Sequence, residues 1–192
     1  MTIRNGSVGN FGDGIHIEDA SRNRIADMSS FGPQDGIDIR RGEANEVRHS
    51  DGRGRNAGMV ITASNGAIVA DSKASGVFGS GLTFTDVDAG RLVRNEVIGA
   101  DAACCQTFGI AVRGNGNVIR DNRVGGWNAG ELVVGAGSDN ALIGKELFDA
   151  GISQQPGDPD SQGDGIFVGV FTAGTLLSGN GNPLQCSNVF CP

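Results

Sequence analysis

The sequence predicts an all-β solenoid, in which short strands stack coil upon coil along one axis. A glycine followed by an alternating apolar strand recurs along the chain, and no window shows the apolar period of a helix. Glycine makes up 33 of the 192 residues, without the three-residue period of collagen. The copies begin at Gly14, Gly36, Gly58, Gly81, Gly109, Gly130 and Gly165, at spacings of 22, 22, 23, 28, 21 and 35 residues.

Each repeat unit has an apolar side that it cannot bury alone. Stacking the units in register gives a continuous core and a parallel ladder. One interior column is then Ile15, Ile37, Met59, Leu82, Ile110 and Ile166, and the next is Ile17, Ile39, Ile61, Phe84, Val112 and Val168. The outward column between them starts with His16 and Asp38 and continues as Val60, Thr83, Ala111, Leu132 and Phe167.

A second apolar cluster follows about eleven residues after most of these glycines, which indicates a second strand per coil. Its members are Ile25, Val47, Ile68, Leu92, Ile119, Leu142 and Leu176. Asparagine recurs at the bends, where it tolerates left-handed backbone and can form side-chain ladders. These residues are Asn23, Asn45, Asn95, Asn117, Asn122 and Asn140.

This pattern resembles the right-handed parallel β-helix proteins, the pectate-lyase-like superfamily, over nearly the whole chain. The resemblance implies one single-stranded, right-handed parallel β-helix domain at residues 1–178, with about seven coils of ~22 residues. The handedness rests on the resemblance alone. The resemblance is specific for the fold and weak for function, because the superfamily includes lyases, hydrolases, epimerases, adhesins and phage spikes.

Two insertions and both chain ends depart from the period. The insertions lie near residues 100–107 and 144–163, and residues 179–192 form a non-repeat tail or cap. The segment Ile3–Val8 matches Ile119–Val124, which lies at the end of a repeat unit, so the chain starts part-way through a coil. We expect the open end to be covered by further N-terminal coils of a longer protein or by another subunit of a homo-oligomer.

The four cysteines are candidates for disulfides: Cys104, Cys105, Cys186 and Cys191. They allow three connectivities, between which the sequence does not choose. Disulfides imply an oxidising compartment, so we expect an extracellular or periplasmic protein, although no signal peptide follows Met1. A zinc site is the alternative, but the pairs lack CxxC spacing.

The strongest candidate site comes from the repeat itself. Residues one unit apart lie about 4.8 Å apart in a stack, so His16 should lie over Asp38, and Glu18 over Arg40. These four are the candidate catalytic residues. His16 would act as base or acid, Arg40 would bind a carboxylate, and the acids would orient it or hold a cation. Ordinary cross-strand pairing is the alternative interpretation.

Four further residues are candidates for binding substrate. Asp13 and Asp35 should stack at the turns before these strands, where they would repel unless protonated or bridged by a cation such as Ca²⁺. Arg113 shares the outward column of Glu18 and Arg40. Trp127 would either stack on a sugar ring or cover a corner of the core.

Charge and motifs narrow the function without fixing it. The net charge of −7 disfavours nucleic acid, and no apolar run reaches the length of a membrane span. Polygalacturonase-type Gly-His-Gly and Asp-Asp motifs are absent, and the alginate-epimerase tyrosine has no counterpart because the chain has no Tyr. Three classes remain: a lyase- or epimerase-like protein acting on an acidic polysaccharide, a noncatalytic carbohydrate-binding or surface module, and a structural fragment of a longer adhesin or spike.

Overall fold

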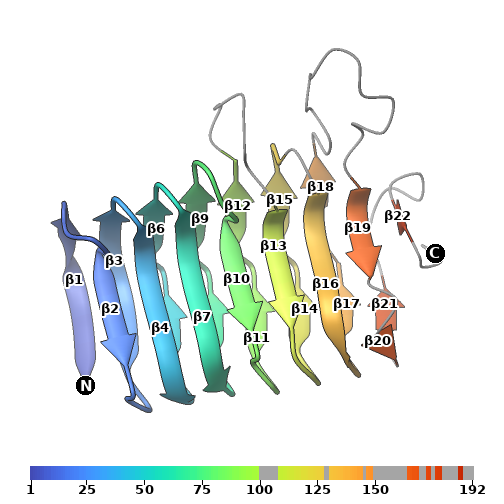
Figure 1. Ribbon diagram of the computed structural model, residues 1–192, viewed down its shortest axis with the longest axis horizontal. Coiled ribbons are helices and arrows are strands. Elements are labelled where there is room, and N and C mark those ends of the chain that lie inside the picture. The colour runs from blue at the N-terminus through green and yellow to red at the C-terminus, as the bar shows by residue number, and fades with distance from the viewer. Residues whose placement is uncertain are drawn as a thin grey trace.

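The computed structural model describes residues 1–99, 108–127 and 135–144 with their side chains. Beyond these it describes the backbone of strands within 130–134, 146–148, 164–168, 172–173, 176–178 and 186–187. The chain is a parallel β-solenoid of about six turns, slightly fewer than the seven expected from the sequence (Figure 1). The all-β solenoid prediction is confirmed.

One long sheet forms the first face of the solenoid, which we call the β4 face. All its strand pairings are parallel. In spatial order it contains β2 (Ile15–Glu18), β4 (Asp35–Glu43), β7 (Ala57–Asn65), β10 (Leu82–Thr85), β13 (Phe108–Arg113), β16 (Gly130–Ser138), β19 (Asp164–Val168) and β22 (Cys186–Ser187), and β20 (Thr172–Ala173) also pairs with β16.

A second sheet covers the other two faces and has two arms that share β3 (Arg24–Gly32), with which β1 (Thr2–Gly9) pairs. The β6 face continues from the second half of β3 through β6 (Asp51–Gly54), β9 (Lys73–Gly76), β12 (Glu96–Ile98), β15 (Arg123–Gly125) and β18 (Glu146–Phe148). The β5 face continues through β5 (Glu46–Arg48), β8 (Ile68–Ala70), β11 (Arg91–Val93), β14 (Val118–Arg120), β17 (Ala141–Ile143) and β21 (Leu176–Ser178).

The interior columns follow the predicted register across the β4 face. Ile15 pairs with Ile37, Ile37 with Met59, and Met59 with Leu82, and all are buried. The expected place of Leu132 in the outward column is wrong, because Leu132 pairs with Ile110 and with Ile166. The glycine alignment is offset there by one residue, since Gly130 lies opposite Phe108.

A similar offset of one residue occurs on the β5 face. Val47 pairs with Val69, which is fully buried, whereas the predicted Ile68 is only partly buried. Leu142 likewise pairs with Leu177 in place of Leu176. Both sites hold two adjacent apolar residues, so apolar pattern alone could not choose the inward one.

The asparagines at the bends form the predicted ladders. The Asn45 carboxamide oxygen accepts hydrogen bonds from the backbone N–H and the side-chain Nδ2 of Asn23, both at 3.0 Å. Asn122 does the same for Asn95, at 2.9 and 3.0 Å. These side chains are buried, so the ladders satisfy polar groups that would otherwise be desolvated without partners.

The repeated glycines are required where the β4 face meets the β6 face. A β-carbon on Gly36 would lie 2.3 Å from the backbone nitrogen of Arg53, and one on Gly58 would lie 2.5 Å from that of Ser75. A β-carbon on Gly81 would lie 2.2 Å from a methyl carbon of Val97. Only glycine therefore lets the two sheets approach this closely.

Strands of the solenoid occur within two of the segments that the sequence set apart from the repeat. Near the start of residues 144–163, β18 pairs in parallel with β15. In the tail, β22 pairs with β19 and so continues the ladder of the β4 face. Residues 100–107 and 149–163 lie outside the described residues.

The first strand lies where the match between Ile3–Val8 and Ile119–Val124 predicted it. Ile3 pairs with Ile25, so β1 occupies the position of a second-sheet strand. Within the described part of the chain, no helix is long and apolar enough to cross a membrane.

The glycine column yields a stability prediction. Gly36→Ala should destabilise the fold by about 3 kcal/mol or more, because the new methyl group would overlap backbone atoms that cannot move independently. Gly12→Ala is the matched control, since its β-carbon would lie 3.9 Å from the nearest atom, at the end of the Gln34 side chain. Urea unfolding measures both variants, and an equal shift in the two would contradict the close-approach argument.

Candidate active site

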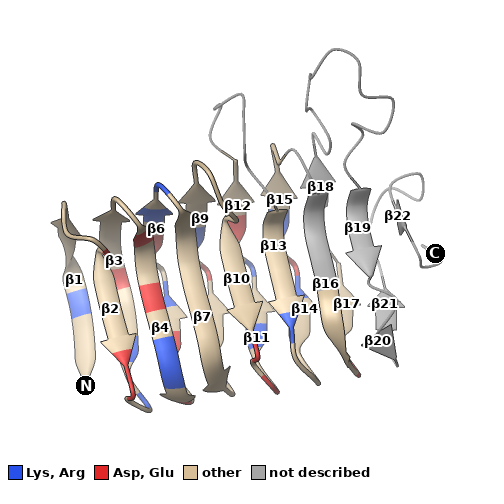
Figure 2. Cartoon of the chain, in the orientation of Figure 1, with Lys and Arg blue, Asp and Glu red and all other residues tan. Residues whose placement is uncertain are grey.

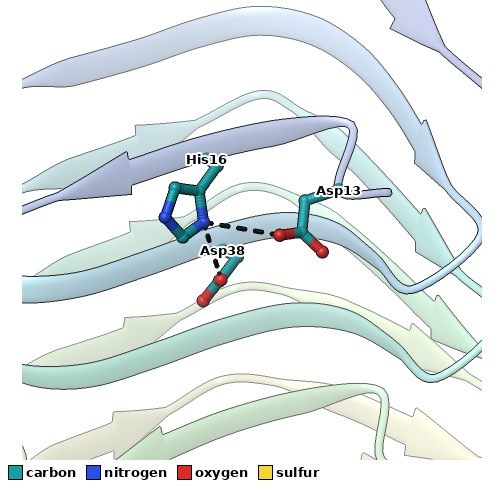
Figure 3. Close-up of side chains that lie close together, drawn as sticks. All are labelled: Asp13, His16 and Asp38. Atoms are coloured by element: carbon teal, nitrogen blue, oxygen red, sulfur yellow. Dashed lines mark hydrogen bonds and ion pairs between the residues drawn. The ribbon is translucent and has the colours of Figure 1, made fainter. Parts of the chain in front are cut away.

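The His16–Asp38 pair forms the centre of the site, and strand alternation positions both residues. His16 lies between buried Ile15 and Ile17 on β2, so its side chain leaves the core and lies over Asp38 of β4. His16 Nδ1 lies 2.9 Å from Asp38 Oδ2 (Figure 3). The 22-residue period therefore placed this pair correctly.

Asp38 is the buried member of the site, with a side chain that is 0% exposed. Its Oδ2 accepts from Arg40 Nε at 2.8 Å as well as from His16. A buried carboxylate requires such partners, because desolvation disfavours its charge. Its Oδ1 is buried without a hydrogen-bond partner among the described residues, a cost of about 1–3 kcal/mol that the site retains.

Two further carboxylates flank the imidazole of His16. Asp13 Oδ2 lies 3.4 Å from Nδ1, and Glu18 Oε2 lies 3.6 Å from Nε2. Nδ1 thus faces two carboxylates, and a hydrogen on Nδ1 is the arrangement that satisfies the shorter contact to Asp38. Nε2 is then the nitrogen that can accept a proton, and the His16 side chain is 38% exposed.

The arginine partners differ from the expected pairing. Glu18 lies opposite Arg40 in register, yet Arg40 binds Asp38, and Glu18 pairs with Arg41 at 2.5 Å. Arg41 also contacts Asp19 at 2.6 Å, from a position near the end of β4 where its φ is +53°. Arg40 binds Asp38 because this carboxylate is buried and needs a positively charged partner. Glu18 is exposed, so water can solvate its charge.

Arg41 is a site residue that was not predicted, although it lies 22 residues, one repeat unit, after Asp19. Hydrogen bonding to the Arg41 guanidinium holds the pKa of Glu18 below its usual value and lowers the pKa of Asp19 in the same way. Glu18 is therefore ionised at neutral pH, next to His16 Nε2.

Asp35 is a buried carboxyl that accepts hydrogen bonds from the next coil. It is 5% exposed, and its Oδ1 accepts from the backbone N–H of Ala57 and from Asn56 Nδ2, both at 3.0 Å. Asp13 Oδ1 in turn accepts from the backbone N–H of Asp35 at 3.2 Å. Burial raises the pKa of Asp35, and the charges of Asp13 and Asp38 raise it further.

These contacts bear on the expected Ca²⁺ between Asp13 and Asp35. Calcium takes six to eight oxygen ligands, whereas the two carboxylates each use an oxygen as acceptor for the backbone of the next coil. The donor set thus does not fit calcium. Asp13, His16 and Asp38 each offer one ligand atom within 4.8 Å of the others, and this mixed nitrogen and oxygen set suits a transition metal better. Arg40 competes for the same Asp38 oxygen.

Arg113 and Trp127 do not join the cluster. Arg113 is in the predicted outward column, but it lies on β13, three strands along the sheet from β4. Trp127 is fully buried in the core, and its Nε1 lies 3.4 Å from the carbonyl oxygen of Val97. Neither face of its ring is exposed to a sugar, so Trp127 covers the core, which was the second of the two predicted roles.

The predicted disulfides involve four cysteines whose side chains lie outside the described residues. These are Cys104, Cys105, Cys186 and Cys191, and of Cys186 only the backbone in β22 is described.

Stacked parallel coils with an outward polar cluster define a β-helix protein. The family model described as the right-handed beta helix region matches residues 1–147. The chain belongs to this family, which confirms the resemblance to right-handed parallel β-helix proteins. A search of curated proteins finds no match.

Solved structures with a similar fold include two of DFA-IIIase from Arthrobacter chlorophenolicus A6. The complex with GF2 gives a TM-score of 0.58 at 12% identity, over 98% of this chain and 58% of that one. The complex with DFA-III gives 0.59 at 11% identity, over 98% and 60%. The chain thus spans about three fifths of the length of these structures, and at such identity the similarity concerns the fold.

The raised pKa of Asp35 gives a pH-dependent prediction. The folded state keeps this proton to higher pH than the unfolded chain, so its ionisation lowers stability as pH rises through the raised pKa. Asp35→Asn keeps the acceptor oxygen and removes that loss. The free energy of unfolding of the variant, relative to wild type, should increase between about pH 3 and pH 7.

Urea unfolding over that pH range makes the measurement. Glu43→Gln is the control, because Glu43 is an exposed carboxylate on the same strand. A difference between Asp35→Asn and wild type that does not change with pH would contradict the argument.

Proposed function

We propose that this β-helix acts on an acidic polysaccharide, by removing the proton next to a uronate carboxylate as lyases and epimerases do. The observation that carries the proposal is the contact between His16 and Asp38. A fully buried carboxylate holds the Nδ1 hydrogen of a partly exposed histidine, which leaves Nε2 as the base, 3.6 Å from Glu18 Oε2. This is the arrangement in which a carboxylate sets the tautomer of a catalytic histidine.

Arg40 provides the carboxylate-binding group of the proposal. Its Nε is held by Asp38, its side chain is 44% exposed, and its terminal nitrogens are the part of the guanidinium that can donate to an external carboxylate. Hydrogen bonding to Asp38 raises the pKa of Arg40, so its positive charge is permanent. That charge would stabilise the enediolate that forms when the adjacent carbon loses its proton.

The reaction then follows one of two courses from a shared first step. His16 Nε2 takes the proton from the carbon next to the carboxylate. In elimination, the electron pair forms a carbon–carbon double bond, the bond to the leaving sugar oxygen breaks, and that oxygen takes up a proton from water. In epimerisation, the same carbon receives a proton from water on its opposite face, and His16 later releases the abstracted proton to solvent. Glu18, ionised through Arg41, faces the nitrogen that carries the abstracted proton.

The comparisons support the carbohydrate part of this proposal. The chain shares its fold with DFA-IIIase, a sugar-processing enzyme solved in complex with GF2 and with DFA-III. A noncatalytic binding module or a structural fragment is the alternative. The proposal favours a location outside the cytoplasm, as the disulfide interpretation of the cysteines also does.

The first functional prediction concerns His16. Wild-type protein should exchange the uronate proton with deuterated solvent on at least one of polygalacturonate and alginate, and elimination would also produce an ultraviolet-absorbing unsaturated sugar. His16→Gln should lower the rate about 10²–10⁴-fold, the usual contribution of a general base. His49→Gln is the matched control, because His49 is the other histidine of the chain and lies at an exposed bend.

The outcomes of this assay separate the classes. Exchange that depends on His16 and not on His49 supports the proposal. The absence of exchange on both polymers, or equal rates in the two histidine variants, would overturn it in favour of the noncatalytic alternatives.

The second functional prediction concerns Asp38 as a positioning residue. Asp38→Asn should lower kcat about tenfold or more, because the amide no longer selects the Nδ1 tautomer, and should also raise KM, because Arg40 loses the carboxylate that holds its Nε. The ¹⁵N chemical shifts of His16 report the tautomer directly. An unchanged tautomer in the variant would show that Asp38 acts only through stability.

A further inference from the structure

Exposed phenylalanines gather at one corner of the solenoid, next to the site already described. Among the described residues, the large exposed hydrophobics are Met1, Phe11, Phe31, Phe78 and Ile98. The last four lie along the corner between the β6 face and the β4 face. Contiguous exposed apolar side chains on a soluble domain mark a binding surface more often than isolated ones.

Backbone register places these residues at the same corner of different coils. Phe31 pairs with Arg53 and Arg53 with Ser75, and Ala74, next to Ser75, pairs with Val97, next to Ile98. In the bend that follows these strands, the backbone N–H of Phe78 donates to the carbonyl of Arg55 at 2.9 Å. Phe11 lies in the same bend of the first coil, where the carbonyl of Gly12 accepts from the N–H of Gln34.

Arg55 adds an available cation to this corner. Its guanidinium carbon lies 4.9 Å from the centre of the Phe78 ring, which is a cation–π contact. Within the described part of the chain, no carboxylate lies within ion-pair distance of Arg55. Arg40 and Arg41, in contrast, are already engaged with acids. Arg55 can therefore bind an external carboxylate without losing an internal ion pair.

The phenylalanine corner, which consists of Phe11, Phe31, Arg55, Phe78 and Ile98, is continuous with the candidate active site. Phe11 is two residues before Asp13, which lies 3.4 Å from His16 Nδ1. On its other side, Ile98 lines a shallow pocket of about 170 Å³ together with Arg53, Lys73 and Glu96. Coils are about 4.8 Å apart, so the corner extends over roughly 20 Å along the solenoid.

We propose that the phenylalanine corner binds the polysaccharide chain on one side of the candidate active site, with sugar rings against the phenylalanines and a uronate carboxylate on Arg55. The apolar C–H face of a sugar ring matches the face of an aromatic ring, and a carboxylate matches the guanidinium fork. This inference rests on the proposed function for the ligand class. Arg55 supplies positive charge at the corner itself, whereas the repulsion from the overall net charge of −7 is screened beyond about 8 Å at physiological salt.

Binding is tested separately from turnover. Isothermal titration calorimetry would use the full chain carrying His16→Gln, with a polygalacturonate oligosaccharide as ligand and dextran as the neutral comparison. Phe78→Ala, Phe11→Ala and Arg55→Ala should each weaken binding of polygalacturonate about threefold to tenfold. Arg55→Ala should also reduce the preference for polygalacturonate over dextran.

Arg91→Ala is the matched control, because Arg91 is an exposed arginine on the β5 face, away from the corner. It should change the affinity by less than the corner variants do, and circular dichroism with thermal unfolding shows whether each variant is folded. Corner variants that bind like the Arg91 control, equal affinity for dextran, or no binding of polygalacturonate would overturn the inference.

The two proposals fail in different ways. If the protein turns over the polymer and the corner substitutions leave KM unchanged, the phenylalanine corner is not the binding site, although the proposed chemistry still holds. Binding that depends on the corner, without exchange of the uronate proton, would sustain the corner as a ligand site and reject the chemistry.

Discussion

The corner at which the β4 face meets the β6 face leaves no room for a β-carbon, and the rest of the solenoid depends on this close approach. Gly36 and Gly58 bring their backbones within contact of the β6-face strands. This closeness narrows the interior so that single columns of isoleucine, leucine and valine fill it. The asparagine ladders then satisfy the polar groups of the bends that close each coil.

The same register that packs the core builds the candidate site. A residue that points outward in one coil lies over its counterpart in the next, so two strands suffice to bring His16, Asp38 and Arg40 together. Burial determines how these groups pair. Asp38 is enclosed and accepts from both His16 and Arg40, whereas Glu18 is exposed and pairs with Arg41. Figure 2 shows acidic and basic residues gathered on β2 and β4, whereas β7 and β10 are nearly free of charge.

The sequence predicted the parts of this structure that follow from period and alternation. It placed His16 over Asp38, because a 22-residue repeat leaves one answer. It misplaced Leu132 and Ile68 by one residue, since adjacent apolar residues satisfy either register. It did not foresee that Arg40 would bind Asp38, because that choice depends on the burial of each carboxylate.

The phenylalanine corner lay beyond prediction for a different reason. Phe11 and Phe78 lie in equivalent bends three repeat units apart, but Pro33 and Arg55 occupy that position in the two coils between them. Phe31 belongs to a strand, so the apolar residues form no regular column in the sequence. For Trp127 the sequence left two interpretations open, because a tryptophan next to a Gly-Gly bend can either stack on a sugar at the surface or cover the core. Its full burial shows that it packs in the core.

A solenoid of this kind can gain or lose length by whole coils, because each coil contacts only its neighbours. Duplication or loss of one 22-residue unit would keep the glycine corner, the interior columns and the ladders in phase. Loss of the coil that holds Asp38 would, however, bring Val60 under His16, since Val60 follows Asp38 in the outward column. The solenoid can therefore keep its packing with more or fewer coils, whereas the candidate site requires the two adjacent coils that hold His16 and Asp38.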